Sequence, residues 1–134
     1  MANYKQAFMN YMDSQGIRYT DSGEHRVRVT YNGDNLKSIP VSVSFDSDGD
    51  NMVTFHCWEI ANFKSKLSDG IIACNFLNNK YRWVKFYIDD DGDAVCSTDA
   101  YLGEDCGKEC MQLVLRIVNI TDEAYPVFMK AHYN

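Results

Sequence analysis

The stretch Trp83–Asp99, WVKFYIDDDGDAVCSTD, decides the fold because it predicts two strands joined by a tight turn. Val84, Phe86 and Ile88 alternate with the residues between them, which is the period of a pleated strand. Asp91-Gly92 follows, and glycine readily takes the positive φ that a tight hairpin turn requires. The residues after the turn alternate again, so the stretch predicts an antiparallel hairpin.

A second hairpin with the same kind of acidic, glycine-containing turn lies upstream. Two alternating segments, at about Lys37–Asp46 and Asn51–Trp58, flank the turn Asp46–Asp50. A further strand, Arg26–Tyr31, leads into the hairpin signal Asn32-Gly33. Short turns between consecutive strands imply antiparallel pairing throughout.

Helices are predicted before, between and after these strands. Residues 2–15 form an amphipathic pattern that stops at Gly16. A second helix is predicted over about Ser65–Tyr81, and a third follows Gly103. With a short strand at Ile17–Tyr19, the predicted order is α-β-β-β-β-α-β-β-α. The fold class is therefore α+β, as one domain over the whole chain of 134 residues.

Two of these helices contain residues that interrupt a helical pattern. Gly70 disfavours helix, so the second helix starts either near Ser65 or beyond Gly70. Its apolar stripe is broad and consists of Phe63, Leu67, Ile71, Ile72, Cys74, Phe76 and Leu77. In the third helix, Tyr125-Pro126 predicts a break or kink, followed by a last turn through Phe128. The buried face before that break is predicted to consist of Leu113, Val114, Ile117, Val118 and Ile120.

The composition limits the classes of function. Hydrophobic residues make up 46% of the chain and charged residues 24%, as in ordinary globular domains. The net charge of −6 disfavours binding to nucleic acid and docking on anionic membranes, because both reward lysine and arginine. The chain has no apolar run that could cross a membrane, and its first residues lack a secretory signal. The five cysteines are then expected to be free thiols in a cytoplasmic protein.

Metal binding and catalysis find little support in the residue pattern. Neither acidic turn places its glycine and carboxylates in the register of an EF-hand calcium loop. Cys106 and Cys110 lie one helical turn apart, but two further zinc ligands are missing from the pattern. His56 and Cys57 are adjacent in a strand, so they point to opposite faces and cannot form a catalytic dyad. We therefore expect no metal, no cofactor and no catalytic residue.

The candidate contact surface is the side of the sheet that faces away from the helices. Strand alternation places aromatic and cationic side chains there, and such residues are enriched at protein contacts. The predicted partner-binding residues are Arg28, His56, Trp58, Trp83 and Tyr87. Two alternatives stay open: a helix or the C-terminal tail covers this face, or the rings only stiffen the sheet.

The second half of the chain also resembles a known bacterial family. Asn75-Phe76-Leu77-Asn78, the strand Trp83–Asp89 ending in Tyr-x-Asp, the Asp91-Gly92 turn and the last amphipathic helix resemble, in this order, the YbjN family. The specific part of the resemblance spans about residues 75–120, and the first half fits more loosely. The high cysteine content is a departure from the family pattern.

The resemblance implies the fold of type III secretion chaperones, a twisted antiparallel sheet flanked by helices. Those chaperones are small, acidic, cytoplasmic and usually dimeric, and they hold an extended segment of a partner. YbjN-like proteins are described as proposed regulators of sensory transduction, with no established catalytic residues. Asn75 and Asn78 match the family's asparagine pair, and we interpret them as caps and turn-formers at the helix end.

We therefore expect a non-enzymatic interaction module, homodimeric, that binds a protein segment by a groove or by strand addition. An alternative is a small-ligand sensor with a pocket between the sheet and the helix at Ser65–Tyr81. A third hypothesis, an enzyme, would require a reactive thiolate at Cys57 or Cys106.

Overall fold

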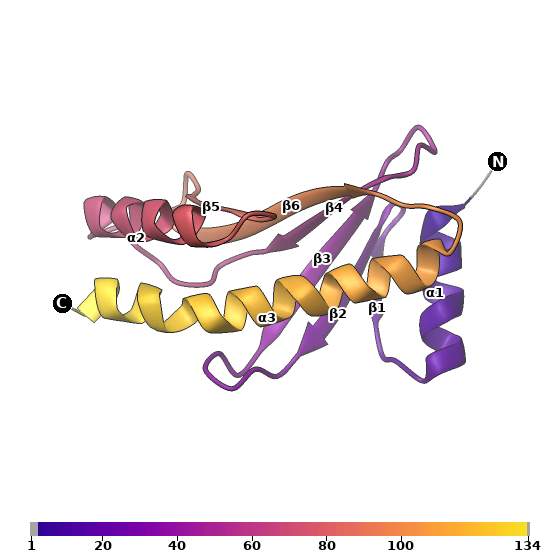
Figure 1. Cartoon of the computed structure of the whole chain (residues 1–134), viewed down its shortest axis with the longest axis horizontal. Helices are drawn as coiled ribbons and strands as arrows, with labels where there is room; N and C mark the ends of the chain where they lie inside the picture. The colour runs from indigo at the N-terminus through magenta and orange to yellow at the C-terminus, as the bar shows by residue number, and fades with distance from the viewer. Residues whose placement is uncertain (1–2, 134) are drawn as a thin grey trace.

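The computed structural model describes residues 3–133 and contains three helices and one antiparallel sheet of six strands (Figure 1). In chain order the elements are α1 (Tyr4–Gln15), β1 (Thr20–Gly23), β2 (Arg26–Tyr31), β3 (Ile39–Phe45), β4 (Met52–Cys57), α2 (Leu67–Lys80), β5 (Lys85–Ile88), β6 (Ala94–Tyr101) and α3 (Cys106–Tyr133). The strands lie side by side in the order β1-β2-β3-β4-β6-β5. The predicted α+β fold and its element order are confirmed, although β1 begins at Thr20 and not at Ile17.

The helices cover one face of the sheet and both of its edges. Figure 1 shows α3 lying across the sheet, with α1 beside β1 at one end and α2 beside β5 at the other. Inward-facing strand residues such as Val43 and Phe55 belong to the same buried core as Val114 and Ile117 of α3. The opposite face of the sheet carries polar side chains, as its strands alternate between buried and exposed residues.

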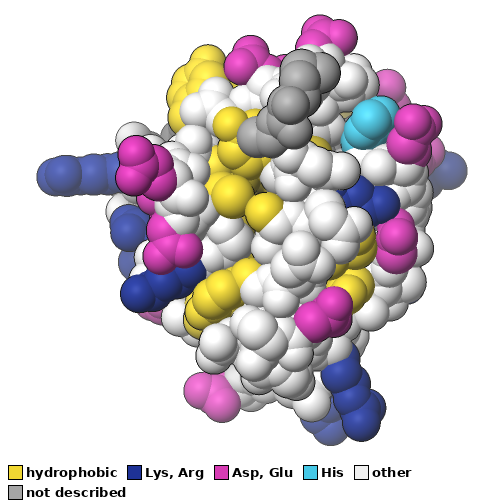
Figure 2. Space-filling model, turned by 90° about the vertical axis from the view of Figure 1, so that its right-hand side faces the viewer, with side chains coloured by type: hydrophobic (Ala, Val, Ile, Leu, Met, Phe, Trp, Pro, Cys, Tyr) yellow, Lys and Arg dark blue, Asp and Glu magenta, His cyan; other side chains and the backbone are white. Residues whose placement is uncertain are grey.

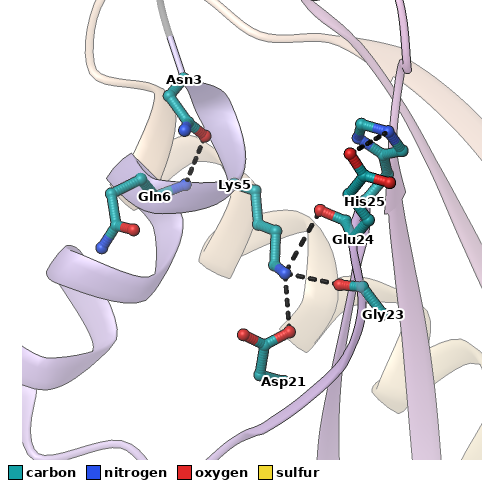
Figure 3. A network of polar contacts seen from close by, with 7 residues as sticks. All are labelled: Asn3, Lys5, Gln6, Asp21, Gly23, Glu24 and His25. Atoms are coloured by element: carbon teal, nitrogen blue, oxygen red, sulfur yellow. Dashed lines mark hydrogen bonds and ion pairs between the residues drawn. The ribbon is translucent and has the colours of Figure 1, made fainter.

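Polar side chains of the helices form hydrogen bonds with both edge strands of the sheet. At β1, Nζ of Lys5 donates to Asp21 Oδ1 and to the carbonyl of Gly23, each at 2.6 Å (Figure 3). At β5, Asn78 Oδ1 accepts the backbone N–H of Phe86 at 2.7 Å, and Nδ2 donates to the same residue's carbonyl at 3.0 Å. Unpaired edge groups are templates for further strands, so these contacts oppose strand addition at Gly23 and Phe86.

Asn78 is therefore a strand clamp and not a helix cap, which corrects its interpretation from the sequence. We expect Asn78→Ala to lower the free energy of unfolding by about 1–2 kcal/mol, because two partly buried backbone groups lose their partner. Denaturant unfolding would measure the change, and Asn75→Ala, at an exposed position on the same helix, is the matched control. Equal destabilisation by the two variants would contradict the clamp.

The third helix does not break where the sequence predicts it. α3 runs from Cys106 to Tyr133 with Pro126 inside it, so the break, one of the two alternatives predicted at Tyr125-Pro126, is wrong. Its buried face includes Phe128, which anchors the turns after the proline in the core. Among residues 3–133, no helix combines the length and apolarity needed to cross a membrane.

Candidate functional site

A row of polar side chains crosses the open face of the sheet. The strand registers place Arg28 of β2 opposite Ser42, Ser42 opposite His56, His56 opposite Ser97, and Ser97 opposite Lys85 of β5. Directly opposite residues in antiparallel strands point to the same face, so these five side chains share one surface. The two serines are buried, so the row is low on either side of His56 and has a cation at each end.

His56 and Trp58 form a flat aromatic platform on this face. Their ring centroids lie 4.2 Å apart with the planes at 5°, and Trp58 is 44% exposed. Partial burial lowers the pKa of His56; nearby Asp99 raises it, whereas Lys85 and Arg26 lower it further. The histidine is therefore held in its neutral form near pH 7, which suits stacking.

Trp83 does not lie on the open face, and this part of the predicted site is wrong. Its ring packs against Phe55 of the core at a centroid distance of 6.1 Å, and Arg116 of α3 lies 5.6 Å from its centroid. The strand β5 begins only at Lys85, so the alternation that relates Trp83 to Tyr87 is broken in the bend before it. Trp83 is a residue of the sheet–helix interface.

The other four predicted residues lie where alternation places them. Arg28 is exposed, His56 and Tyr87 are partly buried, and Trp58 is the most exposed of the aromatic members. Lys85 forms a cation–π contact with Tyr87, and its Nζ lies 5.7 Å from the centroid of the tyrosine ring. The structure therefore groups Arg28, His56 and Trp58 on one continuous surface, with Tyr87 towards its β5 end.

Sequence reasoning missed a second surface, on α2. Its predicted apolar stripe is only partly buried: Leu67, Ile71, Ile72 and Phe76 are exposed by 51%, 53%, 67% and 56%. The residues that face the core are Gly70, Ala73, Cys74 and Leu77. A helix that is apolar on more than one side is typical of a second contact surface, and this breadth was the signal to follow.

Gly70 explains how α2 lies so close to the core. The helix runs through this glycine. An added Cβ at this position would lie 2.6 Å from the ring of Phe63, so only glycine allows the helix to approach this ring so closely. The start beyond Gly70, one of the two alternatives left open by the sequence, is therefore wrong. Close packing on the inner side leaves the larger side chains of α2 on its outer side.

An apolar groove of about 460 Å³ runs between α2 and the end of α3. Its apolar lining comes from both helices, and one acidic and one basic residue also line it. The lining residues are Asp69, Ile72, Ala73, Phe76, Val127, Lys130 and Ala131. A groove of this composition suits a hydrophobic protein surface better than a polar small molecule.

The buried thiols are poorly suited to nucleophilic catalysis. Burial raises the pKa of Cys57 and of Cys74 to about 11, and it also raises the pKa of Cys96 and Cys110. A thiol with a raised pKa is protonated near neutral pH and is a weak nucleophile. Cys57 points into the core whereas His56 lies on the open face, as predicted.

The acidic turn between β5 and β6 is closed by its own hydrogen bonds. Asp89 Oδ1 accepts the backbone N–H of Asp91 at 3.0 Å and that of Asp93 at 2.9 Å. The carboxylates of these three residues lie within 4.8 Å of one another. This arrangement is that of an Asx-type hairpin tip, which needs no ion to form.

A separate polar hollow of about 490 Å³ lies at the α1 end of the molecule, bounded by α1 and the β3–β4 turn. Figure 2 views this end and shows hydrophobic side chains in small groups between charged and polar ones. The Lys5 contacts of Figure 3 form part of its wall. The hollow is therefore remote from α2, where the sequence placed a possible ligand pocket.

Comparison with known proteins identifies the family. The sequence profile of the YbjN family, described as "Putative bacterial sensory transduction regulator", matches residues 7–128. The chain is similar in fold to the crystal structure of YbjN from E. coli, described as "a putative transcription regulator". The TM-score is 0.69 at 13% sequence identity, over 96% of this chain and 92% of that one. None of the curated proteins matches significantly. The matched range covers nearly the whole chain, and the protein therefore belongs to the YbjN family.

Proposed function

We propose that this protein is a non-enzymatic interaction module that pairs with a second copy of itself through the groove between α2 and α3. The observation that carries the proposal is a pair of large apolar side chains in this groove, Ile72 and Phe76, which are exposed by 67% and 56%. Monomeric proteins rarely expose contiguous apolar patches of this kind, because burying them is favourable.

The groove is suited to pairing with its own copy. A two-fold interface brings the same patch of both copies together, so it must be complementary to itself. The groove is lined by apolar residues together with one charge of each sign, Asp69 on α2 and Lys130 on α3. In a two-fold arrangement, Asp69 of each copy can approach Lys130 of the other while Ile72 and Phe76 are buried between them.

Family membership supports a regulatory role in general, and such a role requires a partner that this module contacts. The raised pKa values of the buried thiols agree with a non-enzymatic function. The hollow between α2 and β5 measures only about 270 Å³, so it gives the small-ligand alternative little support. The cytoplasmic location stays a prediction.

We expect Ile72→Glu and Phe76→Glu to weaken self-association by at least about tenfold, because each places a charge in the apolar interface. Size-exclusion chromatography with light scattering over a concentration series would measure the change. Leu115→Glu is the matched control: this residue is 42% exposed and lies on α3 about 18 Å along the helix from Val127. The control variant should dimerise as the wild type does.

Two outcomes would contradict the proposal. A wild-type protein that is monomeric at all concentrations would exclude self-pairing. Loss of dimerisation in Leu115→Glu to the same extent as in Phe76→Glu would place the interface elsewhere. Circular dichroism of each variant would show whether the fold is retained, so that unfolding is not mistaken for dissociation.

A further inference from the structure

We propose that the open face of the sheet binds an extended acidic segment of a protein partner, which crosses the strands between Arg28 and Lys85. This inference concerns a different surface from the α2–α3 groove and does not depend on self-association. The partner segment is expected to be acidic, because the open face carries cations although the chain as a whole is acidic.

The open face carries unneutralised cations in an acidic protein. The net charge of the chain is −6, yet Arg26, Arg28 and Lys85 all project from this face. Within the described residues 3–133, none of the three forms an ion pair. Asp99 is the acidic residue in the same rows, and it already accepts a hydrogen bond from Thr54 at 2.8 Å. Exposed cations that form no ion pair attract carboxylates and repel other cations.

The spacing of the cations fits a short extended segment. Arg28 and Lys85 lie in one cross-strand row that spans β2, β3, β4, β6 and β5. Four steps between strands of about 4.8 Å each give a span of about 19 Å. An extended chain advances about 3.3 Å per residue, so about six residues separate carboxylates that reach both ends.

The centre of the row allows a chain to lie close to the sheet. Ser42 and Ser97 are short and lie low on either side of His56, which occupies the middle of the row. The stacked rings of His56 and Trp58 stand between the two low positions and offer a flat apolar surface for one side chain of the segment. Arg28 and Trp58 are of the residue types enriched at protein contacts.

A protein segment is favoured over nucleic acid as the occupant. Three cations are few for a polyanion with a charge on every residue, and the net charge of −6 repels it at long range. A segment with a few spaced carboxylates needs only the local cations of the open face.

The test uses the full chain and a fluorescein-labelled peptide with two glutamates at each end of a Ser/Gly spacer of about six residues. Fluorescence anisotropy at low salt would measure its affinity. The double variant Arg28→Glu/Lys85→Glu is compared with Lys37→Glu/Lys108→Glu, which changes the net charge equally at exposed positions outside the sheet. The titration is repeated with the Ile72→Glu variant, which alters the α2–α3 groove and leaves the open face unchanged. Peptide binding that persists in this variant does not depend on self-association through the groove.

We expect the Arg28→Glu/Lys85→Glu variant to bind the peptide at least about tenfold more weakly, and the control variant to lose no more than about twofold. The peptide with glutamine in place of glutamate should bind about tenfold more weakly to the wild type. Amide shifts in NMR spectra should map to the five strands of the row, β2, β3, β4, β6 and β5. Equal loss in both double variants, or equal affinity for the two peptides, would overturn the proposal. Displacement of the peptide by a lower concentration of single-stranded DNA would overturn it as well.

Discussion

Phe128→Ala is expected to lower the free energy of unfolding by about 4 kcal/mol, because it empties a fully buried aromatic site. The ring of Phe128 has an exposed fraction of 0% and lies 5.9 Å from the ring centroids of both Phe63 and Phe86. Phe63 precedes α2 and Phe86 lies in β5, so this one side chain joins the end of α3 to two other parts of the fold. Denaturant unfolding would measure the loss.

The same substitution should also act locally on α3. Pro126 removes one helical hydrogen bond, so the turns after it depend on packing more than the turns before it do. We expect faster amide exchange in residues 127–133 of Phe128→Ala than in residues 110–120. Tyr133→Ala, at a position that is 77% exposed, is the control and should change the stability by less than about 0.5 kcal/mol. A loss below about 1 kcal/mol for Phe128→Ala would contradict the anchoring role.

Local patterns in the sequence were enough to predict the strands and their antiparallel hairpins. Alternation in Arg26–Tyr31 and Val53–Cys57 places the same residues inside as the structure does, because a strand has only two faces. The Asp91-Gly92 turn was also readable, since Gly92 has the positive φ of 85° that the hairpin requires. The position of Arg28, His56 and Trp58 on the open face follows from the same alternation.

The errors arose where packing between distant segments decides the outcome. Alternation could not place Trp83, because the bend before β5 turns this residue towards Phe55. The apolar stripe of α2 did not reveal that its larger side chains face outward, because the inner side is set by the approach of Phe63 to Gly70. Tertiary contacts of this kind are absent from any single window of sequence.

Pro126 has a role in the fold that its low helix propensity does not suggest. A proline has no N–H, so the carbonyl of Asp122, four residues earlier, has no helical donor. The side chain of Asn35 in the β2–β3 loop supplies one, with Nδ2 3.2 Å from that carbonyl oxygen. The predicted break is therefore the place where a loop docks on a continuous helix.

Asp122 extends this docking with its carboxylate. Its oxygens accept the backbone N–H groups of Asp34 at 3.0 Å, Asn35 at 2.8 Å and Leu36 at 2.9 Å. Gly33 lies against this carboxylate, and an added Cβ there would collide with Asp122 Oδ1. Burial raises the pKa of Asp122, but the three backbone hydrogen bonds outweigh it and hold the pKa below its usual 3.8.

Asp122→Ala is accordingly expected to lower the free energy of unfolding at pH 7 by about 2–3 kcal/mol, because three charge-assisted hydrogen bonds are lost together. A carboxylate whose pKa is lowered in the folded state stabilises the fold above about pH 4, and this stabilisation is lost as the pH falls through the folded-state pKa. The difference between wild type and variant in urea unfolding should therefore shrink at about pH 3. Glu123→Ala removes the same charge from an exposed neighbour and should have little effect. If the difference stayed constant between the two pH values, the carboxylate would not be what holds the β2–β3 loop on α3.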